Sequence, residues 1–244
     1  MSEEVRPGTL YIVSIPIGNL EDITYRAVKI LAGVDLIAAE DTRKTRVLLD
    51  HYDIRKPLLS YFSYNETRRI PELLEKLKGG KAIGLVSDAG TPGISDPAYR
   101  VIRAALDAAL NVVAIPGPSA FLLALIGSGL PIDSFVFEGF LPVKKGRATM
   151  LGLLRVEQRT MVLYESPHRL NRTLGDLLRV LGDRRIAVSR ELTKKFEETI
   201  RGTMTALIDH FSKHPARGEF VLVIEGARDR KPESDRSSSQ DMPT

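Results

Sequence analysis

Residues 85–97 (Leu-Val-Ser-Asp-Ala-Gly-Thr-Pro-Gly-Ile-Ser-Asp-Pro) combine the residue types of a ligand-binding loop. The apolar run at 82–86 predicts a strand that leads directly into this glycine- and proline-rich segment. Glycine lets the backbone approach a ligand closely, and proline restricts the loop. Such loops bind ligands at the carboxyl ends of strands in open α/β sheets, where Asp88 would contact a hydroxyl or ammonium group. A helix is expected after this loop, with Asp96 as N-cap and Pro97 as first helical residue. The alternative to a ligand site is a plain turn-rich connection between the strand and the helix.

Two further segments have the same character, residues 15–19 (Ile-Pro-Ile-Gly-Asn) and residues 115–120 (Ile-Pro-Gly-Pro-Ser-Ala). A parallel sheet places the loops after its strands on one edge, so all three loops can converge on one small molecule. None of them matches Gly-x-Gly-x-x-Gly or Gly-x-x-x-x-Gly-Lys-[Ser/Thr], which argues against a Rossmann dinucleotide site and a P-loop. Each loop alone is typical of a turn, but together they favour ligand binding.

Four basic clusters lie near predicted strand ends. In the first, Arg43, Lys44 and Arg46 occupy the start of a predicted helix, where each cation opposes the helix dipole by about 0.3–1 kcal/mol. A helix N-terminus with arginine can hold a phosphate, whereas pairing with neighbouring acids is the alternative. The other clusters are residues 144–147 with Lys144 and Lys145, residues 164–169 with His168 and Arg169, and residues 190–195 with Arg190 and Lys194. Together they suggest one positive face.

Aromatic residues lie near these clusters, namely Tyr61, Phe62, Tyr64 and Phe196. Aromatic side chains stack on nucleobases, but they are equally common in a protein core. For Phe196 the core interpretation is preferred.

The composition limits the possible chemistry. The chain has 244 residues, 35 basic and 31 acidic, a net charge of +4 that is compatible with a phosphate-rich partner. The absence of cysteine excludes disulfides, zinc–thiolate sites and cysteine nucleophiles, and the four histidines lack metal-site spacing, so no metal is expected. No apolar run approaches the roughly 20 residues of a membrane span, and residues 1–6 do not resemble a secretory signal. A cytoplasmic location is therefore expected.

Strands and helices alternate along the chain, which predicts an α/β fold. Strands are expected at 10–15, 36–39, 58–62, 82–86 and 112–115, and then at 135–140, 161–164, 186–189, 198–201 and 220–224. One helix is expected to end at Gly33 and another to begin at Pro71. The N-terminal sheet is expected to be mostly parallel and five-stranded. The C-terminal sheet is expected to be mixed, because no helix precedes the strand at 198–201.

The expected domain limits are 1–117 and 118–226, with a possible hinge at residues 116–118. Residues 227–244 are rich in Ser, Asp, Arg and Pro without apolar periodicity, and they are expected to be a disordered tail.

Six segments occur in an order that carries a family resemblance. They are residues 15–24, 39–43, 87–92, 115–119, 165–169 and 190–194. The chain resembles the tetrapyrrole methylase superfamily of class III S-adenosylmethionine (SAM) methyltransferases, over roughly residues 8–226. The Glu-Asp-Thr-Arg, Ser-Pro-His-Arg and Arg-Glu-Leu-Thr-Lys segments resemble its branch of bacterial 16S ribosomal RNA ribose 2′-O-methyltransferases. The resemblance implies two α/β domains with SAM in a cleft between them, a homodimer, and a decoding-centre cytidine in 16S rRNA or the 30S subunit as target.

The resemblance also implies a set of cofactor contacts: Pro16, Ile17, Gly18, Asp88, Thr91, Ser119 and Ala120, with Tyr164 and Leu192 closing the pocket from the second domain. The superfamily's usual Gly-x-Gly turn appears here as Pro-Ile-Gly at residues 16–18, so proline replaces the first glycine of the pattern. The basic residues of the four clusters are expected to bind RNA phosphates: Arg43, Lys44, Arg46, Lys144, Lys145, His168, Arg169, Arg190 and Lys194.

Methyl transfer to a ribose hydroxyl is an in-line displacement, so catalysis depends mostly on alignment. Some group accepts the hydroxyl proton late in the reaction, and Asp41 and Glu191 are the candidates. Their simpler role is to pair with neighbouring basic residues, and that role is preferred.

Two other functions remain open. A small-molecule methyltransferase for a tetrapyrrole would also need arginines, but around a deep apolar trough. A non-catalytic RNA-binding ribosome-assembly factor would explain the basic residues but leave the three loops without a ligand, and it would not bind SAM.

Overall fold

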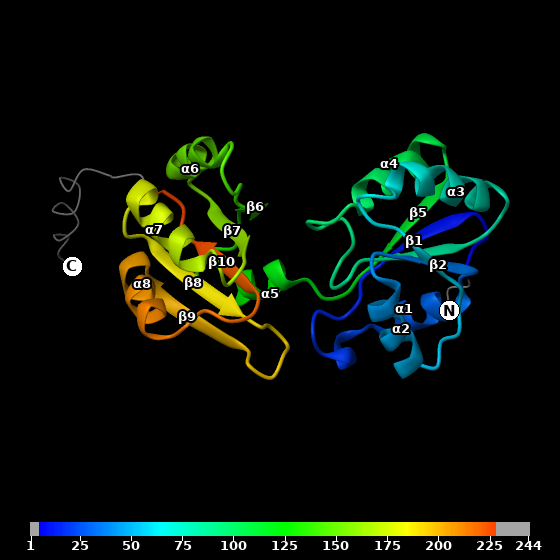
Figure 1. Cartoon of the computed structure of the whole chain (residues 1–244), viewed down its shortest axis with the longest axis horizontal. Coiled ribbons are helices and arrows are strands. Elements are labelled where there is room, and N and C mark those ends of the chain that lie inside the picture. The colour runs from blue at the N-terminus through cyan, green and yellow to red at the C-terminus, as the bar shows by residue number, and fades with distance from the viewer. Residues whose placement is uncertain (1–4, 228–244) are drawn as a thin grey trace, which may run out of the picture. The chain divides into compact units, whose positions relative to one another are not determined.

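The computed structural model describes residues 5–227, so all but the first residue of the expected tail at 227–244 lies outside the described residues. The chain forms two compact units (Figure 1). The first comprises residues up to 127 together with 189–199, and the second comprises 128–188 together with the chain from residue 200. Every helix within residues 5–227 is too short or too polar to cross a lipid bilayer.

The first unit contains a five-stranded parallel sheet, as expected. Its strands are β1 (Thr9–Val13), β2 (Leu36–Ala39), β3 (Leu58–Ser60), β4 (Ile83–Val86) and β5 (Asn111–Ile115). Their order is β3-β2-β4-β1-β5, and all four neighbouring pairs are parallel. The carboxyl ends of the strands therefore share one edge of the sheet, where the three proline- and glycine-containing loops begin.

Helices cover both faces of this sheet (Figure 1). They are α1 (Tyr25–Gly33), α2 (Thr42–His51), α3 (Glu66–Lys78) and α4 (Ala98–Asp107). A short 3-10 turn lies at Leu20–Asp22, and the segment after β5 forms α5 (Ala120–Gly127). Tyr11 and Val13 of β1 pack with residues of α1 and α2, whereas Leu10 and Ile12 pack with residues of α3 and α4. Successive strand side chains point to opposite faces, so each strand of this sheet contributes to two cores.

Two helix starts differ from the sequence-based expectation. α3 begins at Glu66, so Pro71 lies inside the helix rather than at its start. The proline removes one hydrogen bond near the helix start, and burial of Leu73 and Leu77 against the sheet stabilises the helix nevertheless. α4 begins at Ala98, one residue after Pro97.

The second unit contains a mixed five-stranded sheet, as expected. Its strands are β6 (Phe135–Phe140), β7 (Thr160–Glu165), β8 (Arg185–Arg190), β9 (Glu198–Thr203) and β10 (Phe220–Ile224), in the order β6-β7-β10-β8-β9. β7 pairs parallel with β6 and antiparallel with β10. This mixture distinguishes it from the sheet of the first unit.

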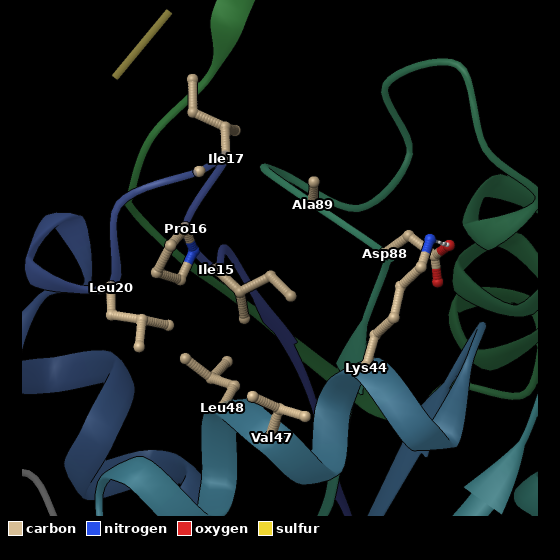
Figure 2. Close-up of a pocket in the computed structure, with 10 residues that line it drawn as sticks. Ile15, Pro16, Ile17, Leu20, Lys44, Val47, Leu48, Asp88 and Ala89 are labelled. Atoms are coloured by element: carbon tan, nitrogen blue, oxygen red, sulfur yellow. Dashed lines mark hydrogen bonds and ion pairs between the residues drawn. The ribbon is translucent and has the colours of Figure 1, made fainter. Parts of the chain in front are cut away.

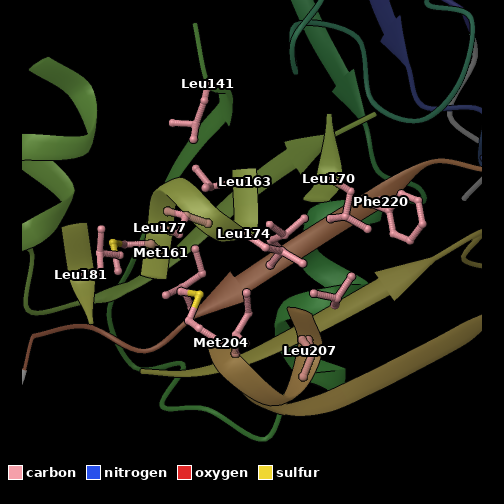
Figure 3. Packing of buried hydrophobic residues seen from close by; sticks show 14 of the residues in the cluster. Leu141, Met161, Leu163, Leu170, Leu174, Leu177, Leu181, Met204, Leu207 and Phe220 are labelled. Atoms are coloured by element: carbon pink, nitrogen blue, oxygen red, sulfur yellow. The ribbon is translucent and has the colours of Figure 1, made fainter. Parts of the chain in front are cut away.

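Three helices pack on the second sheet, α6 (Arg147–Val156), α7 (Leu170–Leu181) and α8 (Met204–Lys213). Figure 3 shows apolar side chains of α7 and α8 meeting those of β7 and β10, and Leu151 and Leu154 of α6 belong to the same core. α7 contributes Leu170, Leu174, Leu177 and Leu181, whose three- and four-residue spacing places them on one helical face.

Candidate active site

Hydrogen bonds join the three loops at the carboxyl edge of the first sheet. The backbone N–H of Ile15 donates to the Gly90 carbonyl at 2.9 Å, and the N–H of Gly90 donates back to Ile15 at 3.0 Å. The Ser14 hydroxyl lies 3.0 Å from both Thr91 Oγ1 and the Ile115 carbonyl oxygen. The Thr91 hydroxyl donates to the Pro118 carbonyl at 3.2 Å. The loops after β1, β4 and β5 therefore form one assembly, and Thr91 contacts the other two.

Two glycines make this close approach possible. A Cβ at Gly117 would lie 2.6 Å from Cβ of Ser14, a distance at which one backbone segment must move. Gly90 has a φ of +74°, which favours glycine, and a Cβ there would lie 3.2 Å from Cγ2 of Ile17. Gly90 and Gly117 are thus favoured by the contacts between the loops.

Replacing Gly117 with alanine is expected to destabilise the protein by about 1–3 kcal/mol, the usual cost of overpacking. Because the added methyl group separates the loops after β1 and β5, binding of any ligand held by both should weaken as well. Thermal unfolding followed by circular dichroism measures the first effect.

Gly152→Ala is the matched control, because a Cβ at this position in α6 meets nothing within 4 Å. Alanine favours a helix over glycine by about 1 kcal/mol, so this variant should be at least as stable as the wild type. Equal stability of the two variants would contradict the close loop packing.

A pocket of about 240 Å³ opens beside the loop assembly (Figure 2). It is lined by Ile15, Pro16, Ile17, Gly18, Leu20, Lys44, Val47, Leu48, Asp88 and Ala89. The walls are mostly apolar, and the Lys44 side chain reaches from α2 to Asp88, which it contacts at 2.6 Å. Four of the expected cofactor contacts therefore line the same pocket. They are Pro16, Ile17 and Gly18 from the loop after β1 and Asp88 from the loop after β4.

Asp88 links this pocket to the end of β2. Its Oδ1 accepts a hydrogen bond from the Asp41 backbone N–H at 3.0 Å, and its own N–H donates to Oε2 of Glu40 at 3.3 Å. Burial, and secondarily the charge of Asp88, raises the pKa of the Glu40 carboxyl. The ion pair with Asp88 raises the pKa of Lys44. Three charged side chains are therefore electrostatically coupled at the ends of β2 and β4.

Asp41 has a different environment from Glu40. It is the N-cap of α2, where Oδ1 accepts from the Arg43 N–H at 2.9 Å, and its carboxylate binds the Arg43 guanidinium at 2.7 Å. Hydrogen bonds from the Arg43 side chain, and next from its backbone N–H, lower the pKa of Asp41. A carboxylate with a lowered pKa is a weaker base, so this geometry favours the pairing role over proton acceptance.

The start of α2 presents its cations on the surface. Arg43 is 89% exposed, and Lys44 and Arg46 are also exposed. Arg43 and Arg46 line a shallow groove of about 450 Å³ together with Thr42 and Leu58. Two of the four expected basic clusters lie in the first unit with the three loops, namely this one and residues 190–195, whose Lys194 side chain packs against Gly18.

The basic residues of the second unit divide into exposed and paired groups. Lys144, Lys145 and His168 are exposed. Arg169 instead contacts Glu165 at 3.2 Å and donates to the Leu141 carbonyl. Its role as an RNA contact stays a prediction, and its structural role is to hold the end of β7.

Arg147, the last residue of the Lys-Lys-Gly-Arg cluster, is 6% exposed. It binds Asp176 at 2.9 Å and donates to the Thr173 hydroxyl at 2.9 Å, and Thr173 in turn donates to Glu165 at 2.6 Å. The cluster therefore mixes two exposed lysines with one buried structural arginine. Nearby, the aromatic ring of Tyr164 packs edge-on against Phe137, with 5.0 Å between centroids.

The segment after β8 has an unusual backbone. Glu191 and Thr193, which flank Leu192, have φ values of +47° and +67°. Such conformations are costly for a β-branched residue and concentrate at functional sites. Within the segment, Glu191 binds Lys194 at 3.0 Å. Arg190 lies 2.8 Å from Glu198. Glu191 therefore has the pairing role that was preferred for it.

Sequence reasoning did not single out Glu40. It lies next to Asp41 in the Glu-Asp-Thr-Arg segment, and its position directly after a buried strand was the available signal. Within the described part of the chain, His, Asp and Glu side chains nowhere gather in a set of three or more that could hold a metal ion.

Comparison with known proteins identifies relatives of the whole described chain. The family model "Tetrapyrrole (Corrin/Porphyrin) Methylases" matches residues 9–208. Proteins named "Ribosomal RNA small subunit methyltransferase I" are similar in sequence. The one from Synechocystis sp. is 53% identical, covering 90% of this chain and 80% of that protein. The one from Thermotoga maritima is 49% identical, covering 90% and 99%.

Two solved structures share the fold. A cobalt precorrin-4 methyltransferase superimposes with a TM-score of 0.67 at 17% identity, covering 89% of this chain and 95% of that one. A uroporphyrin-III C-methyltransferase from Thermus thermophilus, complexed with S-adenosylhomocysteine, superimposes with a TM-score of 0.64 at 16% identity, covering 89% and 97%. At this level of identity, the likeness concerns the fold alone.

Proposed function

Because the chain belongs to the tetrapyrrole (corrin/porphyrin) methylase family, we propose that it is an SAM-dependent methyltransferase whose substrate is small-subunit ribosomal RNA. The single observation that carries the RNA substrate is the 53% identity, over 90% of the chain, to a protein named ribosomal RNA small subunit methyltransferase I. The two tetrapyrrole methyltransferases of the same fold described above are only 17% and 16% identical. The specific product that we propose is a ribose 2′-O-methylated cytidine in the decoding centre of 16S rRNA.

The residues of the loop assembly fit SAM. The cofactor carries positive charge on its sulphonium and ammonium groups, and the pocket offers the Asp88 carboxylate among apolar walls. Gly90 and Gly117 keep Cβ atoms out of the space where the loops meet, so backbone groups can approach a ligand closely. We propose that Pro16, Ile17, Gly18, Asp88 and Thr91 bind the cofactor. Ser119 and Ala120, at the end of the third loop, belong to the same proposal.

When bound, SAM supplies an activated methyl group, so the protein's own task is to hold the ribose oxygen in line with it. The exposed cations at the start of α2 would hold RNA phosphates beside the cofactor loops. Glu40, whose pKa is raised by burial, is better suited than Asp41 to accept the hydroxyl proton as the carbon–oxygen bond forms.

The proposal also covers the domain organisation, the oligomeric state and the location of the protein. We propose domains at 1–117 and 118–226 with the cofactor in the cleft between them, closed by Tyr164 and Leu192. We also propose a cytoplasmic homodimer that acts on 16S rRNA, either naked or in the 30S subunit. Exposed apolar side chains on α5 support the dimer, namely Leu122, Leu123 and Ile126.

Purified protein incubated with radiolabelled SAM, and with naked 16S rRNA and 30S subunits in parallel, tests this function. We expect label in one of the two RNA substrates, mapped to the 2′-oxygen of a single cytidine. Transfer to a tetrapyrrole and not to RNA would contradict the proposal in favour of a small-molecule methyltransferase. SAM binding measured by calorimetry separates both from a non-catalytic RNA-binding factor, which would give no heat.

A further inference from the structure

Lys194 of the segment between β8 and β9 packs against the loop after β1. Residues 189–199, which contain this segment, belong to the first unit. A Cβ at Gly18 would overlap Cγ of Lys194, and it would lie 3.1 Å from Cδ and 2.9 Å from Cε of the same side chain. Three carbons of the lysine stem therefore occupy the place that a side chain at position 18 would take.

The contact is made close to the backbone of Lys194 rather than at the end of its side chain. The nearest atom is Cγ, whose position is set by the χ1 rotamer alone. A methyl group at position 18 would therefore force a different χ1 rotamer, which swings the ammonium group away from Glu191, its partner at 3.0 Å. Gly18 has no positive φ, so alanine would bring no backbone strain there. The lysine stem is thus the feature that favours glycine at position 18.

Three hydrogen bonds hold the backbone around Lys194. The N–H of Lys194 donates to the Glu191 carbonyl at 2.9 Å, and the N–H of Glu197 donates to the Lys194 carbonyl at 3.0 Å. The N–H of Thr193 donates to Oε2 of Glu197 at 2.5 Å. Within this frame Glu191 and Thr193 keep φ values of +47° and +67°. Strain of this kind persists only where the surroundings impose it, and it concentrates at functional sites.

The orientation of Lys194 differs from that of the residues that follow it. Its side chain is 29% exposed. Lys195 is exposed, and its Nζ lies 5.7 Å from the centre of the Phe196 ring. Phe196, for which a core position was expected, is 66% exposed. Lys194 therefore packs its apolar stem on the protein, whereas Lys195 extends into solvent.

Gly18 connects this contact to the proposed cofactor site. It lines the pocket beside Pro16 and Ile17, whereas Lys194 does not line that pocket. The loop is fixed to the loop after β4 at Ile15, three residues before Gly18. A second point of attachment at Gly18 limits the movement of the residues between them. Lys194 is thus placed to act on a bound cofactor through the loop rather than by contact.

We propose that Lys194 is a positioning residue of the cofactor site, whose alkyl stem packs on Gly18 and holds the loop after β1 in its binding conformation. The inference rests on the proposed function, because it requires that this loop binds SAM. Glu191 sets the direction of the stem by pairing with the ammonium group. This role differs from the contact with an RNA phosphate that the basic cluster suggested for Lys194.

Two substitutions at Lys194 separate the stem from the charge. Lys194→Ala removes the three packed carbons and should weaken SAM binding roughly 3- to 10-fold, the effect of losing the preorganisation of one loop. Lys194→Met keeps a stem that reaches as far as Cε without the ammonium group. It should bind SAM within about twofold of the wild type, because a partly exposed ion pair contributes little. Calorimetry measures the SAM affinity of both variants.

A cycle of variants tests the contact itself. Gly18→Ala should weaken SAM binding by a similar factor, because the added methyl group displaces the lysine stem. When Gly18→Ala is combined with Lys194→Ala, the methyl group meets no stem. The loss in the double variant should then be no larger than the loss in either single variant. Losses that multiply would show two independent effects and would overturn the inference.

Lys195→Ala is the matched control, because it removes the same side chain from the next residue, and it should leave SAM affinity unchanged. Melting temperatures verify folding, and Gly18→Ala decides the question if Lys194→Ala does not fold. Unchanged SAM affinity in the folded variants, or an equal loss in Lys194→Met, would overturn the inference alone. So would a loss of RNA affinity without a loss of SAM affinity, which would make Lys194 a phosphate contact. A wild type that binds no SAM would overturn the proposed function, and the inference with it.

Discussion

Replacing both Arg43 and Arg46 with alanine is expected to lower kcat/KM for ribosomal RNA by roughly 100-fold while leaving SAM affinity unchanged. Hydrogen bonds to charged groups contribute about 1.5–3 kcal/mol each, so the loss of two phosphate contacts amounts to about 3 kcal/mol or more. Both side chains are exposed, and neither lines the pocket that contains Asp88. Single-turnover methylation and calorimetry measure the two quantities.

The matched control is the double variant Lys76→Ala and Lys78→Ala, which removes the same charge from the last turn of α3. That turn lies at the opposite end of α3 from the strand carboxyl ends, so this variant should keep the wild-type rate. The salt dependence of RNA binding should also become less steep in the arginine variant, because fewer counterions are released. Equal losses in both double variants would indicate a general charge effect, and a loss of SAM affinity would place the arginines in the cofactor site.

Replacing Asp88 with asparagine is expected to weaken SAM binding by roughly 10- to 100-fold, in line with about 1.5–3 kcal/mol for a charge-assisted contact. The substitution also leaves the ammonium group of Lys44, now 2.6 Å from a neutral side chain, to repel a cationic cofactor. Asparagine keeps an oxygen that can accept from the Asp41 N–H, so the backbone of the loop should be preserved.

Two companion variants separate charge from structure. Asp107→Asn removes an exposed carboxylate that pairs with Arg103 at the end of α4, and it should not affect SAM binding. Adding Lys44→Met to Asp88→Asn should recover part of the lost affinity, because it removes the repelling ammonium group. If Asp88→Asn binds SAM as tightly as the wild type, and the double variant shows no further gain in SAM affinity, Asp88 does not take part in cofactor binding.

The sequence predicted the architecture well, because apolar runs and their spacing report burial directly. The predicted strand at 36–39 coincides with β2, and α1 ends at Gly33 as expected. Convergence of the three loops also followed from the sequence, since strand ends of a parallel sheet share an edge. The contacts that join the loops did not follow, because the Ile15–Gly90 bridge depends on the register of distant strands.

Side-chain pairing was the least predictable part of the site. Arg147 and Lys145 belong to one basic cluster in the sequence, yet Arg147 is buried against Asp176 and Lys145 is exposed. Likewise, Glu40 and Asp41 are neighbouring acids with pKa values shifted in opposite directions. Burial and pairing are set by residues far away in the chain, so composition and local spacing do not determine them.

The central claim is that the loops after β1, β4 and β5 hold the methyl donor. A crystal structure of the full chain with S-adenosylhomocysteine tests it most directly. We expect the ligand to contact Ile17, Asp88 and Thr91. A ligand bound elsewhere, with these three residues free of contact, would contradict the claim.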